Sequence, residues 1–191
     1  NESNIDINAS GDTYVYMAIG ETGSLAQTEL TFQDNTDLSA LTSGMTIASN
    51  GGLLSVPTFS VDTYSGNNST LSIDNGIDLA GEGGLTWIKY RDGQFGGGHY
   101  LFDTERGNAS LYSNTNDQEY SPDNRLNFDS SGFNVTIDGG QAVNATDYPY
   151  VAWSFRKAPG FFDIQTWTGN GVEGRQIPHN LGSTPGMIMI K

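Results

Sequence analysis

The sequence predicts an all-β fold, built as an antiparallel sandwich or barrel. Two observations support this prediction, and a third concerns the organisation of the chain. Short segments rich in aromatic and β-branched residues recur along the chain, and clusters of Gly, Asn, Asp, Ser and Thr separate them at intervals of about 8–12 residues. No apolar pattern with a helical period extends over more than about ten residues. One segment of the chain also recurs at a fixed distance, which is typical of proteins made of repeated units.

The recurring segment defines the expected domains. Residues 59–67 (FSVDTYSGN) reappear as residues 162–170 (FDIQTWTGN), 103 residues later in the chain. A second pair relates residues 14–18 (YVYMA) to residues 150–154 (YVAWS), 136 residues apart. A unit of about 100 residues is large enough to bury one hydrophobic core. We therefore expect closing strands of a preceding repeat in 1–22, a small insert or linker module in 23–57, a complete unit in 58–158, and opening strands of a further repeat in 161–191.

The two partial units lead to a further expectation. The similarity continues downstream, where residues 73–77 correspond to 177–181 and residues 87–89 correspond to 189–191. The chain therefore looks as if it were cut within a repeat at both ends, and neither end has enough strands for a sandwich core. We expect the two halves to complete each other, within the chain or between neighbouring copies, or to dock on sequence outside it.

Alternating side chains place the strands of the complete unit. Phe59, Val61 and Thr63 alternate with polar neighbours, as expected for a strand with one buried face. Residues 125–128 and 133–137 flank a four-residue turn, DSSG, and predict a β-hairpin. The expected strands are 12–19, 30–32 and 45–47 before the complete unit, and 58–64, 71–73, 85–90, 99–103, 109–112, 125–128, 133–137 and 148–155 within it.

The composition argues against several classes of partner. The formal net charge of −14 repels phosphate backbones, so we expect no binding to nucleic acid. The sequence has no cysteine and therefore neither a disulfide nor a thiolate metal site. No apolar run approaches the roughly 20 residues that cross a membrane as a helix, so we expect no membrane insertion.

Several ordered motifs resemble one family. In the repeated region they are residues 150–164 (YVAWSFRKAPGFFDI), 168–171 (TGNG), 177–182 (IPHNLG) and 185–188 (PGMI); within the complete unit they are 87–89, 101–107 and 128–133. Together they resemble repeated domains of virion proteins in marine and cyanobacterial tailed phages. The resemblance covers about residues 58–191 together with 11–20. It implies concanavalin A-like (laminin-G-like) jelly rolls, which sit in tail fibres and other exposed appendages.

The resemblance implies a setting more than a site. The expected function is a non-enzymatic structural component of a phage virion, in the tail, a fibre or another exposed appendage. The expected partners are other copies of the chain, other virion proteins and host cell-surface carbohydrate. One alternative is a dedicated carbohydrate-binding (lectin) module, and a weaker one is a glycoside hydrolase on the same fold.

The carboxylates give little support to the hydrolase. Glucanases on this fold hold nucleophile and acid on one strand with an E-x-D-x-x-E pattern, which is absent here. The nearest pairs are Asp103 with Glu105 and Asp117 with Glu119. We expect Asp103 to be an acid at a strand end paired with Arg106, and we assign no catalytic residue.

Calcium is the one cofactor that the sequence leaves open. Lectin-like jelly rolls often bind it through loop carboxylates, amides and backbone carbonyls. A single loop offers such oxygen atoms, and the alternative interpretation is a solvated acidic loop that keeps a sheet edge soluble. The candidate calcium ligands are Asn116, Asp117, Glu119 and Asp123.

Sugar binding needs exposed aromatic rings beside hydrogen-bonding side chains. Trp87 and Trp153 lie in strong strands, so we expect them in the core. Trp167 takes the place of Tyr64 in the repeat, which suggests a packing role for the aromatic ring. The candidate glycan-binding residues are Tyr90, Tyr112 and Tyr120.

Overall fold

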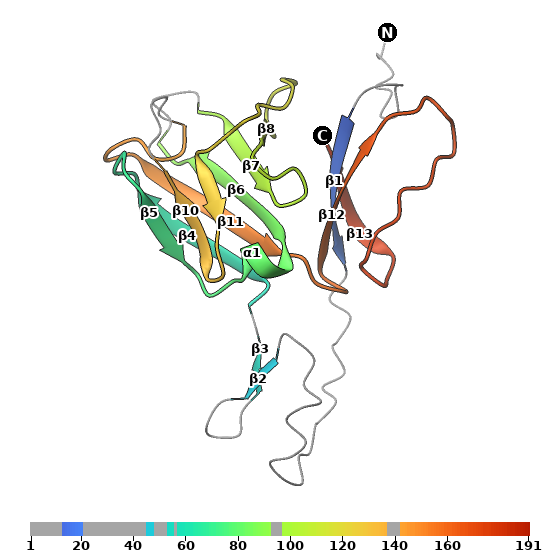
Figure 1. Cartoon of the computed structure of the whole chain (residues 1–191), viewed down its shortest axis with the longest axis horizontal. Helices are drawn as coiled ribbons and strands as arrows, with labels where there is room; N and C mark the ends of the chain where they lie inside the picture. Colours follow the sequence, from blue (N-terminus) through green and yellow to red (C-terminus); the bar gives the residue numbers. More distant parts are fainter. Residues whose placement is uncertain (1–12, 21–44, 48–52, 56, 93–96, 137–141) are drawn as a thin grey trace.

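The protein is an antiparallel all-β molecule, as the sequence predicts (Figure 1). The computed structural model describes residues 13–20, 45–47, 53–55, 57–92, 97–136 and 142–191, with the side chains described from residue 57 onward. The strands are β1 (Thr13–Gly20), β2 (Met45–Ile47), β3 (Leu53–Ser55), β4 (Phe59–Ser65), β5 (Leu71–Asp74), β6 (Gly84–Tyr90), β7 (His99–Asp103), β8 (Ser110–Tyr112), β9 (Leu126–Phe128), β10 (Gly132–Val135), β11 (Pro149–Arg156), β12 (Phe162–Thr168) and β13 (Pro185–Ile190).

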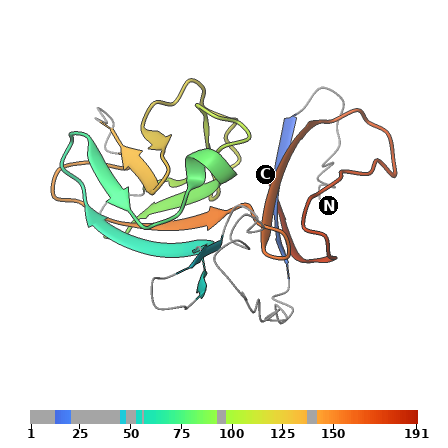
Figure 2. The same cartoon turned by 60° about the horizontal axis from the view of Figure 1, so that its bottom comes forward.

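Two of the sheets form a complete sandwich. A five-stranded sheet in the order β4-β11-β6-β7-β8 packs against a three-stranded sheet in the order β5-β10-β9 (Figures 1 and 2). Alternate residues of each strand point between the sheets, so that Ile88, Tyr150 and Ala152 meet Phe133 and Val135 in a fully buried core. The predicted hairpin is confirmed, because Phe128 at the end of β9 pairs with Phe133 of β10.

One helical turn interrupts the strands, which the sequence analysis did not anticipate. Helix α1 (Leu79–Glu82) is four residues long, too short to produce a periodic pattern in the sequence. The side chain of Asp78 accepts a hydrogen bond from the backbone N–H of Gly81 at 2.7 Å, as an N-terminal cap does. Leu79 is fully buried in the sandwich core, so the turn closes one end of the sandwich.

A second sheet repeats half of the sandwich with strands from both ends of the chain. Its order, β12-β1-β13, corresponds to β4-β11-β6 of the complete unit. The register is also the same as far as Ile19, because the pairs of one sheet have repeat counterparts in the other, and it shifts between β1 and β13 at Gly20. The matched pairs are Tyr150–Tyr64 and Tyr14–Trp167 on one side of the central strand, and Ala152–Ile88 and Tyr16–Ile190 on the other side.

The expectation that the two halves meet is therefore confirmed in its within-chain form. The strand near the N-terminus, β1, lies between β12 and β13 and pairs with both of them. Together, β1, β12 and β13 form a sheet but not a sandwich. In the described part of the chain, no second sheet covers the side of β12-β1-β13 that corresponds to the core of the complete unit.

The insert between the units contains a short hairpin. Strands β2 and β3 pair with each other, with Thr46 opposite Leu54. The predicted strand at residues 30–32 lies outside the described residues. Among the helices of the described residues, none has the length and apolar character needed to cross a membrane.

Candidate functional site

The contact between the two units is the best-defined functional feature. The five-stranded sheet has an outer face, turned away from β5-β10-β9, and the second sheet packs against it (Figure 1). We call this contact the joint. The aromatic rings of Phe155 and Phe162 stack across it with their centroids 5.3 Å apart. Its buried apolar residues are Leu85, Leu101 and Leu111 of the complete unit, with Phe162 and Ile164 of β12.

The repeat provides an internal comparison for the joint. Phe162 and Ile164 are 1% and 0% exposed, whereas their counterparts Phe59 and Val61 are 44% and 52% exposed. The same strand pattern is therefore buried in the second sheet and exposed to solvent in the complete unit. Burial of such side chains contributes about 1.5–3 kcal/mol each, so the joint is a substantial apolar contact.

Polar contacts fix the segment that crosses the joint. The ammonium group of Lys157 donates to the carboxylate of Glu105 at 2.5 Å and lies 3.9 Å from that of Asp163. Asp163 is 1% exposed and accepts a hydrogen bond from the backbone N–H of Asn180 at 2.6 Å. The backbone N–H of Lys157 also donates to the carbonyl of Gly83 at 2.9 Å. The crossing is therefore anchored to both units.

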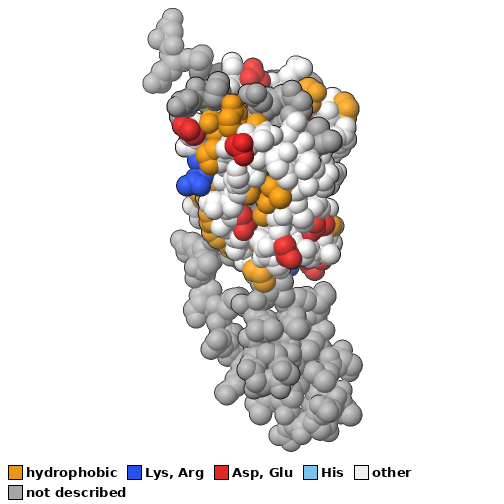
Figure 3. All heavy atoms as spheres, turned by 90° about the vertical axis from the view of Figure 1, so that its left-hand side faces the viewer, with side chains coloured by type: hydrophobic (Ala, Val, Ile, Leu, Met, Phe, Trp, Pro, Cys, Tyr) orange, Lys and Arg blue, Asp and Glu red, His pale blue; other side chains and the backbone are white. Residues whose placement is uncertain are grey.

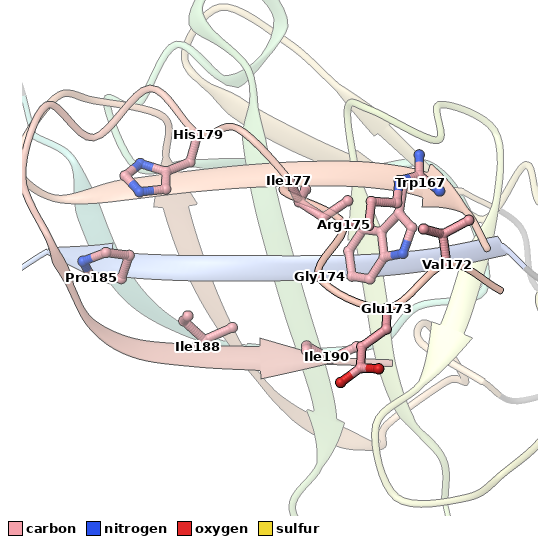
Figure 4. A pocket seen from close by; sticks show the side chains of 10 residues that line it. All are labelled: Trp167, Val172, Glu173, Gly174, Arg175, Ile177, His179, Pro185, Ile188 and Ile190. Carbon is pink, nitrogen blue, oxygen red and sulfur yellow. The ribbon is translucent and has the colours of Figure 1, made fainter. Parts of the chain in front are cut away.

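The inner side of the second sheet forms an apolar hollow of about 430 Å³ (Figure 4). We call it the open face. Ile188 and Ile190 of β13 are 56% and 38% exposed there, whereas Ile88, the counterpart of Ile190, is 0% exposed in the complete core. The hollow is lined by Trp167, Val172, Glu173, Gly174, Arg175, Ile177, His179, Pro185, Ile188 and Ile190. Its surface is thus that of a sandwich core which no second sheet covers among the described residues.

The loop between β12 and β13 supplies a polar rim to the open face. Glu173, Arg175 and His179 all belong to this loop, as Figure 4 shows. The guanidinium of Arg175 donates to the carbonyl of Thr168. The imidazole Nδ1 of His179 accepts from the backbone N–H of Leu181 at 3.3 Å, so this histidine supports a turn. The open face therefore combines an aromatic and aliphatic floor with groups of both charges.

The predicted glycan residues fall into two separate clusters. The guanidinium of Arg125 lies over the ring of Tyr100, 4.7 Å from its centroid, and 5.3 Å from that of Tyr120. Tyr112 belongs to the same group, with its ring centroid 4.8 Å from that of Tyr100. Tyr120 is 58% exposed, while Tyr112 is partly buried. Tyr90 belongs to a second cluster, with Tyr64, Tyr148 and Tyr150.

Of the predicted calcium ligands, Asp123 already has partners within the protein. Its carboxylate is 2% exposed, accepts from the Arg125 guanidinium at 2.5 and 2.7 Å, and accepts from the Ser110 hydroxyl at 2.5 Å. Burial alone would raise the pKa of Asp123, but the hydrogen bonds from Arg125 and Ser110 outweigh it and lower the pKa. This carboxylate is held as a structural anion.

The other calcium candidates lie in an exposed loop. Glu119 approaches the guanidinium of Arg106 at 3.4 Å, and Asp117 accepts from the hydroxyl of Thr115 at 2.8 Å. Asn116 is also exposed. In the described ranges, no group of three or more His, Asp or Glu residues is arranged to hold a metal ion. The calcium site predicted from the sequence therefore has no support from the described contacts.

The pairing expected for Asp103 is confirmed. Asp103 is fully buried at the end of β7 and accepts from the Arg106 side chain at 2.6 Å. Its neighbour Glu105 pairs with Lys157 at the joint instead of with Arg106. The two carboxylates thus have separate cationic partners.

Comparison with known proteins gives one match. The model of a family described as a domain of unknown function, DUF7483, matches residues 55–191, which include the complete unit together with β12 and β13. No curated protein gives a significant match to the chain. No solved structure gives one either.

Proposed function

The chain belongs to the DUF7483 family, and we propose that it is a non-enzymatic structural component of a phage virion, built from repeated jelly-roll units of a tail or fibre. The observation that carries the proposal is the anchored joint between two sheets of the same order and register. A protein that repeats one sheet and fixes the copies against each other is suited to mechanical assembly.

The joint supports a rigid connection. Only residues 157–161 separate β11 from β12, and the side chain of Lys157 within this segment is paired with Glu105. Apolar packing by Phe162 and Ile164 continues directly from the linker into the second sheet. Units joined in this way hold a surface at a fixed distance and orientation from their attachment point.

The virion setting is supported by the sequence motifs that resemble phage virion domains. The surface is compatible with exposure on a particle: acidic side chains are scattered among uncharged ones on the side turned away from the second sheet (Figure 3). The formal net charge of −14 keeps such repeated units soluble and prevents non-specific association.

A structural role also agrees with the state of the carboxylates. Asp103 is fully buried against Arg106, and Glu105 is bound to Lys157. Glycoside hydrolysis requires two carboxyl groups that face one sugar, with one of them free to donate a proton. Carboxylates that are already paired with a cationic side chain are poorly suited to that role.

Labelling of particles tests the proposal. Antibodies raised against the purified chain should label intact phage particles from a host infected with the phage that encodes it, at one repeated position seen by immunogold electron microscopy. Pre-absorption of the antibodies with the purified chain is the control. Recovery of the chain only in the soluble fraction of lysed cells, and never on particles, would contradict a virion role.

Glycan binding is a second candidate, favoured by the open face. Trp167 borders a hollow whose rim carries Glu173, Arg175 and His179, and an aromatic platform beside polar groups suits a sugar ring. A glycan array probed with the chain should then give signals that Trp167→Ala abolishes and Trp153→Ala retains. Equal signals from both variants would place any glycan contact away from the open face.

A further inference from the structure

Strand β1 is held by a part of the chain that is distant in sequence. Its extensive contacts are with β12 and β13, to which it pairs through seven and five register partners. The whole complete unit lies between β1 and these strands along the chain. The contacts that seat β1 therefore depend on residues 162–190 and not on the strands that lie next to it in sequence.

The repeat shows what kind of contact this is. In the complete unit, the closing strand β11 lies between β4 and β6, and β1 occupies the same place between β12 and β13 in the same register. Pairing on both edges is made by backbone hydrogen bonds, which do not depend on the chain that supplies the strand. Any copy of β1 presented to β12 and β13 makes the same ladder.

We propose that β1 is exchanged between copies of this chain, so that β1 of one copy enters between β12 and β13 of the next. The donated strand and the accepting edges are different surfaces. Such a contact is heterologous. A copy that donates its β1 still has its own acceptor open to the β1 of another copy, so that the copies join head to tail. The partner is a second copy of the same chain.

Concentration sets the balance between the two arrangements. A strand tethered to its own acceptor has an effective concentration on the order of 1 mM. Within-chain pairing therefore dominates in dilute solution, and exchange becomes comparable when the acceptors of other copies reach a similar local concentration. Exchange uses the repeated architecture behind the proposed function, yet it holds for the purified chain whether or not the chain belongs to a virion.

Engineered cysteines test the exchange in the full-length chain, which has no cysteine of its own. Val15 of β1 is the register partner of Thr166 of β12, and Thr166 is exposed. Directly opposed residues in an antiparallel pair are within disulfide range. Val15→Cys and Thr166→Cys are made in separate copies, which are mixed, unfolded and refolded together and then oxidised. The protein concentration is varied from about 0.01 to about 1 mM, up to the effective concentration of the tethered strand.

The expected result is a disulfide-linked heterodimer whose share rises with concentration. In an equal mixture it approaches about a quarter of the Val15→Cys copies near 1 mM, because about half of the strands are exchanged there and half of those enter a Thr166→Cys copy. The matched control mixes Val15→Cys with Ser183→Cys, an exposed residue that is not a partner of β1, and should give only background linkage. The double variant V15C/T166C measures the within-chain pair. The proposal is overturned if the double variant forms its within-chain disulfide efficiently while separate copies show only background linkage. It is also overturned if neither the within-chain disulfide nor the disulfide between copies forms. Particle labelling is independent of these results, so the two proposals fail separately.

Discussion

The joint can be tested with two matched substitutions of the same residue type. Phe162→Ala removes a ring that is 1% exposed and packed between the sheets, and Phe59→Ala removes its repeat counterpart, which is 44% exposed. Truncation of a buried Phe costs about 3–5 kcal/mol, because the transfer term is lost and a cavity remains. We therefore expect Phe162→Ala to lower the free energy of unfolding of the second sheet by about 3–5 kcal/mol.

The expected loss at Phe59 is smaller for a structural reason. Its ring contacts Phe155 at a centroid distance of 4.9 Å, but nearly half of its surface already faces water. Removal then costs about 1 kcal/mol, the value of one aromatic contact with partial burial. The difference between the two variants, about 2–4 kcal/mol, isolates the contribution of the joint.

Guanidinium unfolding followed by tryptophan fluorescence measures both losses. Trp167 belongs to the second sheet, whereas Trp87 and Trp153 belong to the complete unit, so single-tryptophan versions report each part. For Phe162→Ala, the Trp167 signal should unfold earlier than the other two signals. Equal losses for Phe162→Ala and Phe59→Ala would show that the sheets do not pack through Phe162, and the reasoning about a rigid joint would be refuted.

Three further outcomes are expected. Asp123→Asn should destabilise the chain at pH 7 by about 3 kcal/mol, because it removes the buried negative charge that neutralises the Arg125 guanidinium. Because the pKa of Asp123 is lowered in the folded chain, the stability lost in Asp123→Asn is fully present above the usual carboxylate pKa, near pH 4. The difference from the unsubstituted chain should shrink as the pH falls through the lowered pKa, and urea unfolding from pH 7 to pH 2 measures it. Gly84→Ala should cost about 1–3 kcal/mol in thermal melts, since a Cβ there would lie 2.1 Å from the carbonyl oxygen of Phe155. Calcium at about 5 mM should leave the melting temperature within about 1 °C, because Asp123 is already bound to Arg125, and a larger rise would restore the loop as a calcium site.

Much of the fold could be predicted because it follows from local patterns. Alternation in residues 59–65 correctly predicts a strand, but not which face is buried. In β4 the apolar residues Phe59 and Val61 are exposed, and the residues between them are partly buried. The repeat also predicted which strands belong together, since residues 14–18 and 162–170 carry the pairing pattern of the complete unit. The four-residue helix α1 could not be predicted, because it has less than two helical turns and depends on a tertiary cover for Leu79.

The candidate site was harder to predict, because it depends on which faces are covered. The repeat predicts a packing role for Trp167, and the structure places its ring beside Ile177 and Leu181. The repeat held the signal for the open face: Ile190 corresponds to Ile88, a core position, although nothing in a single sequence says whether a second sheet is present. The glycan and calcium candidates rest on residue type alone. Residue type does not predict that Asp123 is buried and paired with Arg125.

The burial patterns of β4 and β7 differ because the second sheet covers β7 and leaves β4 exposed. Strand β4, which the second sheet leaves open, alternates between exposed and partly buried residues, whereas four consecutive residues of β7 are buried. A strand in an isolated sandwich buries one face only, so burial of both faces of β7 requires a layer outside the sandwich. The second sheet is that layer, because Leu101 of β7 packs with Phe162 and Ile164. The outer face of β4, with Phe59 and Val61, keeps the apolar pattern that β12 uses at the joint. Strand β4 of the complete unit therefore carries the apolar pattern that its counterpart β12 buries at the joint.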